Sequence, residues 1–176
     1  SASASVGQSV NALTLATPDD TDDLGRALAQ HLPAGHVVMY LDGDLGAGKT
    51  TTARALLHAL GITGAVRSPT YTLIERYDSP QGEVAHLDLY RIADPEELEY
   101  LALDELAERA RVWLIEWPQR GQGALPAADL ILRLRVEGHG RCALLDAASP
   151  RGKAWADAVL EVMQARPTRK SAQPAP

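Results

Sequence analysis

Apolar residues near the amino end of the chain follow a strand, helix, strand pattern. The short runs "ALTLA" at residues 12–16 and "HVVMYL" at residues 36–41 have the length and composition of β-strands. Between them, Thr17 offers a capping hydroxyl and Pro18 suits the first helical position. These signals predict a helix that runs to about His31.

The stretch from Lys49 onward has helical spacing. Alanine and leucine recur on one face of "KTTTARALLHAL", and Gly61 is a suitable C-cap, so a second helix is expected between these residues. The acidic run "DDTDD" at residues 19–23 falls in the first turn of the earlier helix, where the positive end of the helix dipole favours carboxylates.

The middle of the chain predicts a hairpin and a helix. The runs "TYTLIERY" at residues 70–77 and "VAHLDLY" at residues 84–90 have strand character and are joined by the turn-rich "DSPQG". Asp94, followed by a proline and by Glu97, forms a capping-box arrangement. We therefore expect one helix over residues 94–107.

The last part of the chain alternates again. A strand is predicted at "RVWLIE", residues 111–116, and an antiparallel pair at "DLILRLRV", residues 129–136, and "RCALLDA", residues 141–147. Ser149 and the proline after it predict a final helix to about Gln164.

A glycine-rich loop joins the strand at 36–41 to the helix at 49–60. Gly43, Gly48, Lys49 and Thr50 match the P-loop pattern G-x-x-x-x-G-K-[ST]. In this setting backbone N–H groups and a helix N-terminus surround polyphosphate, Lys49 reaches the β and γ phosphates, and the Thr50 hydroxyl ligates Mg²⁺. The residues expected to bind nucleotide here are Asp44, Leu45, Gly46, Ala47, Gly48, Lys49, Thr50 and Thr51.

A P-loop site needs a carboxylate to orient the metal ion and its waters. Glu116 ends an apolar run, where a charge is costly unless it is partnered, so we expect it to act on the metal together with Thr50. Asp88 shares one strand face with His86 and Tyr90 and is expected near the attacking water. A solvated strand carboxylate is the alternative for Asp88.

These elements predict an α/β fold, a P-loop NTPase-like three-layer sandwich with a mixed central β-sheet. The chain has 176 residues, which suits a single P-loop ATPase domain at residues 11–165. Residues 1–10 are expected to form a flexible leader. Residues 166–176 are expected to form a disordered tail, because they offer few apolar side chains to bury.

Composition narrows the function classes. The formal net charge of −6 argues against a protein that grips nucleic acid through a broad basic face. Cys142 is the only cysteine and no apolar run is long enough to span a membrane, which favours a cytoplasmic protein. An N-K-x-D element for guanine and a D-x-x-G switch are both missing, so ATP is the expected nucleotide.

Four segments together resemble one family. They are "GDLGAGKTT", "SPTYTLIERY", "HLDLYR" and "LIEWPQRG", within a similarity that covers roughly residues 15–150. The chain resembles the small bacterial ATPase of tRNA threonylcarbamoyladenosine synthesis, the TsaE family. The resemblance implies a mixed central sheet and slow hydrolysis of Mg-ATP. It also implies work with a threonylcarbamoyl transferase and its inactive paralogue, which modify the adenosine beside the tRNA anticodon, so that tRNA is met indirectly through the complex.

The resemblance also implies roles for single residues. It supports Lys49, Thr50 and Glu116 as above, and makes Asp88 necessary for hydrolysis. Thr70, in "SPTY", would lie in a switch-like segment near the γ-phosphate, and Trp117 would lie close to the nucleotide, although a core aromatic is an equal alternative.

Some positions and functions stay open. Many members of the family have an acidic residue where this chain has Gln119, which puts in doubt any role that depends on a charge at this position. Arg67 and Arg91 face nucleotide, partner or solvent. A small-molecule P-loop kinase is the alternative function, although no lid segment is evident, and a nucleotide-dependent binding module is a third.

Overall fold

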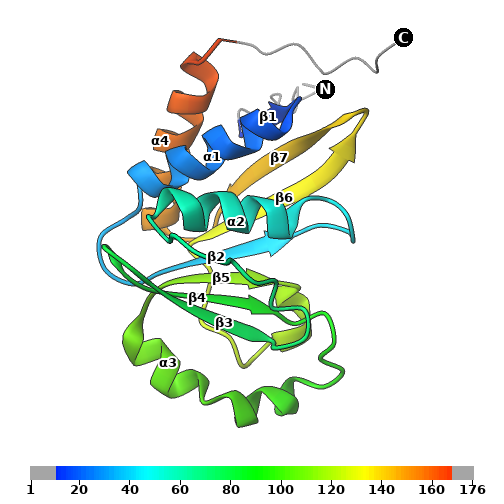
Figure 1. The fold of residues 1–176 in the computed structure, drawn as a ribbon, viewed down its shortest axis with the longest axis vertical. Coiled ribbons are helices and arrows are strands. Elements are labelled where there is room, and N and C mark those ends of the chain that lie inside the picture. The colour runs from blue at the N-terminus through cyan, green and yellow to red at the C-terminus, as the bar shows by residue number, and fades with distance from the viewer. Residues whose placement is uncertain (1–10, 168–176) are drawn as a thin grey trace, which may run out of the picture.

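The strands and helices assemble around one sheet, which the computed structural model describes within residues 11–167 (Figure 1). The described sheet has seven strands in the order β1-β7-β6-β2-β5-β4-β3. The strands are β1 (Ala12–Leu15), β2 (Val37–Asp42), β3 (Ile74–Ser79), β4 (Gly82–Asp88), β5 (Ala110–Glu116), β6 (Leu130–Glu137) and β7 (Gly140–Ala147). The α-helices are α1 (Pro18–Gln30), α2 (Lys49–Ala59), α3 (Leu103–Arg109) and α4 (Pro150–Ala165), and the 3₁₀ helices are η1 (Pro95–Leu101) and η2 (Pro118–Gly121).

The middle of the sheet is parallel and its edges are antiparallel. Strand β2 pairs in parallel with β5 and β6, and β4 pairs in parallel with β5. Strands β3, β7 and β1 each pair antiparallel with their neighbours. The predicted mixed sheet is therefore confirmed. In the register, Glu116 of β5 lies opposite both Leu41 of β2 and Asp88 of β4, so these strands end level with one another.

The side chains of β2 alternate between two hydrophobic layers. Val37, Met39 and Leu41 are buried in a cluster with residues of α1, α2 and α4. Val38 is buried in a second cluster with residues of η1 and α3. Successive strand residues point to opposite faces, so helices cover both faces of the central strands, as the sequence predicted.

The last helix is held against the first. The indole N–H of Trp155 in α4 donates to the Leu28 carbonyl oxygen of α1 at 3.1 Å. Arg166, just past α4, forms an ion pair with Asp20 in the first turn of α1. Burial opposes the ionisation of Asp20, but its hydrogen bonds with Arg166 and the Thr17 N–H outweigh that effect and lower the pKa of Asp20.

The single helix predicted over residues 94–107 is wrong. Asp94 and Glu97 do form the expected cap, but the segment is a 3₁₀ helix, η1, that ends at Leu101, and α3 begins at Leu103. Ala102 between them is left-handed, with φ of 50°. Leucines of both short helices are buried against the sheet, so tertiary packing overrides the local helix signal.

The strand predicted over residues 70–77 is also shorter than expected. Leu73 has φ of 67° and β3 begins only at Ile74, so Thr70 lies in a turn before the strand. Strand β4 ends at Asp88, two residues before the predicted end of its run. The predicted leader at residues 1–10 and residues 168–176 of the predicted tail lie outside the described residues. Within the described chain, none of the helices is long and apolar enough to cross a bilayer.

Candidate functional site

The P-loop leaves β2 at the edge of the sheet where the parallel strands end. Gly48 is the N-cap of α2 and has φ of 98°, a left-handed conformation that favours glycine. A Cβ on Gly43 would lie 2.4 Å from the Leu134 carbonyl oxygen, so the loop can approach β6 only because this residue is glycine. The first N–H groups of α2 have no partner within the helix, which makes this end of α2 a site for anions.

A pocket of about 330 Å³ opens over the loop, and we call it the P-loop pocket. Most residues predicted from the sequence line it. Its lining is Leu45, Gly46, Gly48, Lys49, Thr50, Thr51, Thr70, Asp88, Tyr90, Glu116, Trp117 and Arg141. Two predicted binding residues do not line it: Ala47 is buried in the core, and Asp44 presents its carbonyl oxygen to Lys49.

Lys49 lies on the floor of the pocket and is only 5% exposed. Its ammonium group donates to the carbonyl oxygens of Gly43 and Asp44, the latter at 2.9 Å, and lies 4.3 Å from the centre of the Trp117 ring. Burial lowers the pKa of Lys49, and the negative charge of Glu116 opposes part of that shift. The partners of this ammonium are mostly neutral, so it remains available to an anion.

Glu116 is buried and has a hydrogen-bond partner on each carboxylate oxygen. The Thr50 hydroxyl donates to Oε1 at 2.9 Å, and His86 Nε2 lies 2.7 Å from Oε2. Asp88, the neighbour of Glu116 on β4, is 6% exposed, so the alternative of a solvated carboxylate does not hold. Burial, together with the nearby charge of Glu116, raises the pKa of Asp88.

Thr70 and Trp117 lie on the sides of the pocket. The hydroxyls of Thr70 and Ser68 are 2.7 Å apart, which holds the turn before β3 together. Trp117 is left-handed, with φ of 56°, and its ring lies 5.0 Å from that of Tyr90. Trp117 both lines the pocket and packs on the second hydrophobic cluster. The two predicted alternatives, a pocket residue and a core aromatic, therefore both describe its position.

The oxygen atoms at this site suit Mg²⁺. A hydroxyl from Thr50 and carboxylates from Glu116 and Asp88 line one pocket, and Mg²⁺ prefers oxygen ligands. Among the described residues there is no group of three or more His, Cys, Asp and Glu side chains that could hold a metal ion by themselves. Mg²⁺ usually keeps waters and takes substrate phosphates as ligands, so this small set of protein oxygens fits a metal that arrives with a nucleotide.

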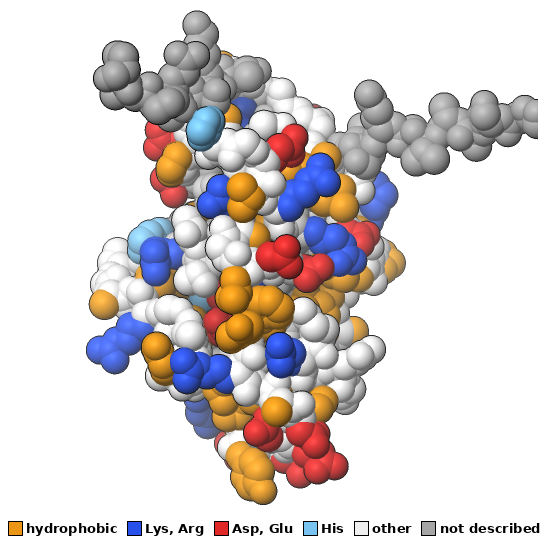
Figure 2. Space-filling view, turned by 90° about the vertical axis from the view of Figure 1, so that its right-hand side faces the viewer, with side chains coloured by type: hydrophobic (Ala, Val, Ile, Leu, Met, Phe, Trp, Pro, Cys, Tyr) orange, Lys and Arg blue, Asp and Glu red, His pale blue; other side chains and the backbone are white. Residues whose placement is uncertain are grey.

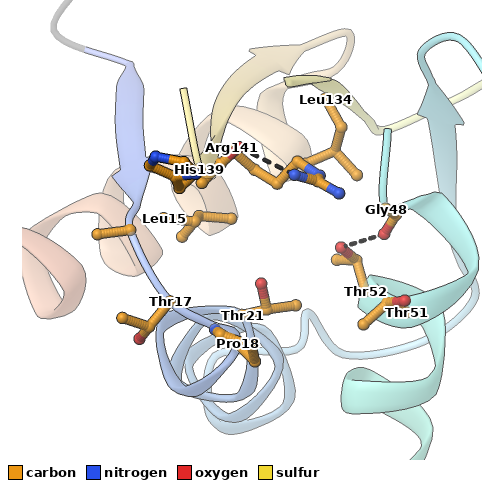
Figure 3. A pocket seen from close by; sticks show the side chains of 12 residues that line it. Leu15, Thr17, Pro18, Thr21, Gly48, Thr51, Thr52, Leu134, His139 and Arg141 are labelled. Carbon is orange, nitrogen blue, oxygen red and sulfur yellow. Dashed lines mark hydrogen bonds between the residues drawn. The ribbon is translucent and has the colours of Figure 1, made fainter. Parts of the chain in front are cut away.

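A second pocket of about 260 Å³ adjoins the first, and we call it the side pocket (Figure 3). It shares Gly48, Thr51 and Arg141 with the P-loop pocket. The rest of its lining comes from the end of β1, the first turn of α1 and the segment between them, from Thr52 of α2, and from β6, the start of β7 and the turn between them. Leu15, Thr17, Pro18, Thr21, Leu134 and His139 are labelled in Figure 3. The sequence prediction missed the side pocket, because its walls are far apart in the chain and no local motif joins them.

Arg141 lines both pockets, and the sequence prediction missed this residue too. Its guanidinium donates to the carbonyl oxygens of Gly140 at 3.0 Å and of Gly46 at 3.3 Å. Within the described part of the chain it forms no ion pair with a carboxylate. A guanidinium that contacts the P-loop and has no acidic partner is suited to bind a phosphate group of a nucleotide.

The three residues whose roles the sequence left undecided lie outside both pockets. The Arg91 guanidinium lies 4.2 Å from the centre of the exposed Tyr71 ring. The backbone of Arg67 is hydrogen-bonded to the Tyr77 hydroxyl. Gln119 is exposed in η2. None of these three polar residues lines the described pockets.

The mouth of the P-loop pocket carries apolar side chains. Leu45 is 66% exposed and Tyr90 is 37% exposed, and both line the pocket. Figure 2 faces the carboxyl ends of the parallel strands and shows apolar side chains gathered near the centre of this face, with Lys and Arg side chains beside them. We call Leu45 and Tyr90 the apolar rim of the P-loop pocket.

Comparison with known proteins finds one family. Residues 15–143 match the family model described as threonylcarbamoyl adenosine biosynthesis protein TsaE. The chain is 41% identical over 150 residues to the tRNA threonylcarbamoyladenosine biosynthesis protein TsaE of Haemophilus influenzae, which covers 82% of this chain and 95% of that protein. It is 37% identical over 121 residues to the protein of the same name from Bacillus subtilis, which covers 69% of this chain and 75% of that protein.

A solved structure agrees with the sequence comparison. The crystal structure of Bacillus subtilis YdiB superposes with a TM-score of 0.71 at 27% sequence identity, covering 85% of this chain and 93% of that chain. The predicted P-loop NTPase-like fold is confirmed by this similarity and by the observed sheet.

Proposed function

The chain belongs to the TsaE family of tRNA threonylcarbamoyladenosine biosynthesis proteins, and we propose that in this process it binds and hydrolyses Mg-ATP. One observation carries the proposal. A P-loop with Lys49 and Thr50 faces two buried carboxylates, Glu116 and Asp88, in a single pocket. A phosphate cradle alone suits a binding protein, whereas buried acids beside it are the groups that hydrolysis needs.

The triphosphate is proposed to bind at the N-terminus of α2. Lys49 would exchange the carbonyl oxygens of Gly43 and Asp44 for phosphate oxygens, which is favourable because a charge replaces neutral acceptors. Thr50 and Glu116 would hold Mg²⁺, which supplies charge neutralisation for the phosphates.

Asp88 is proposed to hold the attacking water. Its carboxylate lines the same pocket as Lys49, and one oxygen, Oδ1, is occupied by the Tyr90 N–H at 3.0 Å. The second oxygen is left to accept a hydrogen bond from water and so orient it. The raised pKa of Asp88 makes it a better proton acceptor than an exposed aspartate. Thr70, on the pocket wall, would close the site around the γ-phosphate.

The nucleoside is proposed to occupy the side pocket. The two pockets share Gly48 and Thr51, so a molecule whose phosphates lie on the P-loop can extend its other end there. Leu15 and Leu134 supply apolar surface for a base, and Arg141 reaches both pockets. ATP is the proposed nucleotide, in agreement with the missing guanine motif.

The proposed partners are the threonylcarbamoyl transferase and its inactive paralogue, with tRNA met through the complex. The apolar rim around the P-loop pocket supports a protein partner at its mouth, where hydrolysis and docking could influence each other. The proposed compartment is the cytoplasm, which the free, buried thiol of Cys142 supports.

Phosphate release from Mg-ATP tests this function. The chain is measured alone and with the purified transferase pair and tRNA, and the pair with tRNA but without the chain is the control. We expect slow release by the chain alone and a clear rise with the pair. Phosphate transferred to a small metabolite, with no response to the pair, would instead support a kinase.

A further inference from the structure

His86 is the buried neighbour of Glu116. It lies on β4, is 1% exposed, and its Nε2 atom is 2.7 Å from Oε2 of Glu116, which is 2% exposed. The other oxygen of Glu116, Oε1, accepts from the Thr50 hydroxyl at 2.9 Å. The two carboxylate oxygens therefore have different partners, one inside the protein and one at the pocket.

The surroundings of His86 fix which ring nitrogen carries the proton. Its Nδ1 atom is buried and has no hydrogen-bond partner among the described residues. A proton on Nδ1 would be an unsatisfied buried donor, whereas a proton on Nε2 donates to Glu116. The Nε2–H tautomer is thus favoured, and His86 acts as a donor to the carboxylate.

His86 lines neither the P-loop pocket nor the side pocket. Its hydrogen-bond partner Glu116 does line the P-loop pocket. The geometry therefore connects His86 to a nucleotide in that pocket through Glu116 and not by direct contact.

We propose that His86 is a positioning residue that fixes Glu116 for Mg²⁺; this inference rests on the proposed ATPase function. By occupying Oε2, the imidazole prevents rotation of the carboxylate and keeps Oε1 turned toward Thr50. A carboxylate held in this way presents its free lone pairs to a metal in one orientation, and loss of such an outer partner typically weakens metal binding by about 10-fold to 100-fold.

The test compares His86→Gln with His86→Leu. The amide N–H of glutamine can reach the position of Nε2, whereas leucine has similar bulk and no donor. ATP affinity is measured by isothermal titration calorimetry with Mg²⁺ and again with EDTA, and the gain in affinity from Mg²⁺ is the readout. His58→Leu, an exposed histidine of α2, is the matched control.

In His86→Leu, the gain in ATP affinity from Mg²⁺ should fall by about tenfold, whereas the ATP affinity in EDTA should stay within about twofold of wild type. His86→Gln and His58→Leu should keep the gain. His86→Asn, whose amide is too short to reach Glu116, should behave like His86→Leu and replaces it if that variant does not fold.

An unchanged gain from Mg²⁺ in folded His86→Leu or His86→Asn would overturn the inference, as would an equal loss in His86→Gln. If the wild-type protein binds ATP and gains affinity from Mg²⁺, these results leave the proposed function standing. A wild-type protein that binds no ATP in either condition would contradict the proposed function and, with it, this role of His86.

Discussion

At the scale of single residues, burial sets the chemistry of the site. Asp88 and Glu116 end neighbouring parallel strands, and both are nearly inaccessible to water. Ionised carboxylates are costly in such places, and the raised pKa of Asp88 expresses that cost. A protein keeps such a group where its reactivity is needed, as in water activation.

Asp88→Asn should therefore lower the ATPase activity and raise the stability of the protein. Removing the carboxylate is expected to slow phosphate release by about 100-fold, the usual size of a lost proton acceptor. It should also raise stability at neutral pH by about 1 kcal/mol, or roughly 2–4 °C in Tm, because a buried charge is replaced by an amide of the same shape. Phosphate release and thermal melts measure the two effects.

The stability effect has a defined pH dependence. Because folding raises the pKa of Asp88 above its ordinary value of 3.8, the ionisation of Asp88 destabilises the fold; this cost is absent below pH 3.8, grows as pH rises toward the folded pKa and is complete above it. The Tm difference between Asp88→Asn and wild type should thus be present at neutral pH and close on acidification. A variant that is less stable than wild type at pH 7 would contradict this.

How far the sequence predicts single residues depends on how local their partners are. Lys49 and Thr50 follow from a loop pattern, because backbone geometry and side-chain role lie within eight residues. The roles assigned to Asp88 and Glu116 remain predictions, although the structure brings both into one pocket. His86 could not be assigned from the sequence, since its partner lies 30 positions away.

At the scale of elements, the sequence predicts the order of strands and helices, but not every boundary. Thr17, Asp94 and Ser149 are the N-caps of their helices as expected, because caps depend on neighbouring residues. The predicted capping by the Thr17 hydroxyl is wrong: this hydroxyl has no hydrogen-bond partner among the described residues, and Asp20 instead accepts from the Thr17 N–H. The break at Ala102 and the late start of β3 depend instead on which leucines the sheet buries. The local helix and strand propensities of a segment do not predict such tertiary packing.

The break at Ala102 predicts a stabilising substitution. Ala102→Gly should raise the free energy of unfolding by about 1 kcal/mol, because glycine adopts the left-handed conformation without the clash that alanine meets. Thermal or urea unfolding measures the change, which should appear as a rise of about 2–4 °C in Tm.

Ala107→Gly is the matched control, because Ala107 is exposed within α3. There the same change should destabilise by about 1 kcal/mol, the ordinary cost of glycine in a helix. Equal destabilisation by both substitutions would mean that Ala102 is not left-handed in solution.

At the scale of the whole molecule, the sheet order creates the site. Placing β2 beside β5, and β5 beside β4, brings the P-loop, Glu116 and Asp88 to one edge, and pairing β6 with β7 brings Arg141 to the same loop. The fold class could be predicted from the alternation of elements. The side pocket could not, since it needs the amino-terminal segment, the P-loop and the β6–β7 turn to meet.

The central claim is that binding and hydrolysis depend on different residues of one site: Lys49 binds the triphosphate, whereas Glu116 and Asp88 act in its hydrolysis. The most direct test measures ATP binding by calorimetry and phosphate release side by side in wild type, Lys49→Ala and Glu116→Ala. We expect Lys49→Ala to lose at least about tenfold in ATP affinity. Measured in EDTA, Glu116→Ala should keep most of its ATP affinity; it should lose the gain in affinity from Mg²⁺ and slow phosphate release by about 100-fold. An equal loss of ATP binding in EDTA in both variants, or unchanged phosphate release in Glu116→Ala, would contradict the claim.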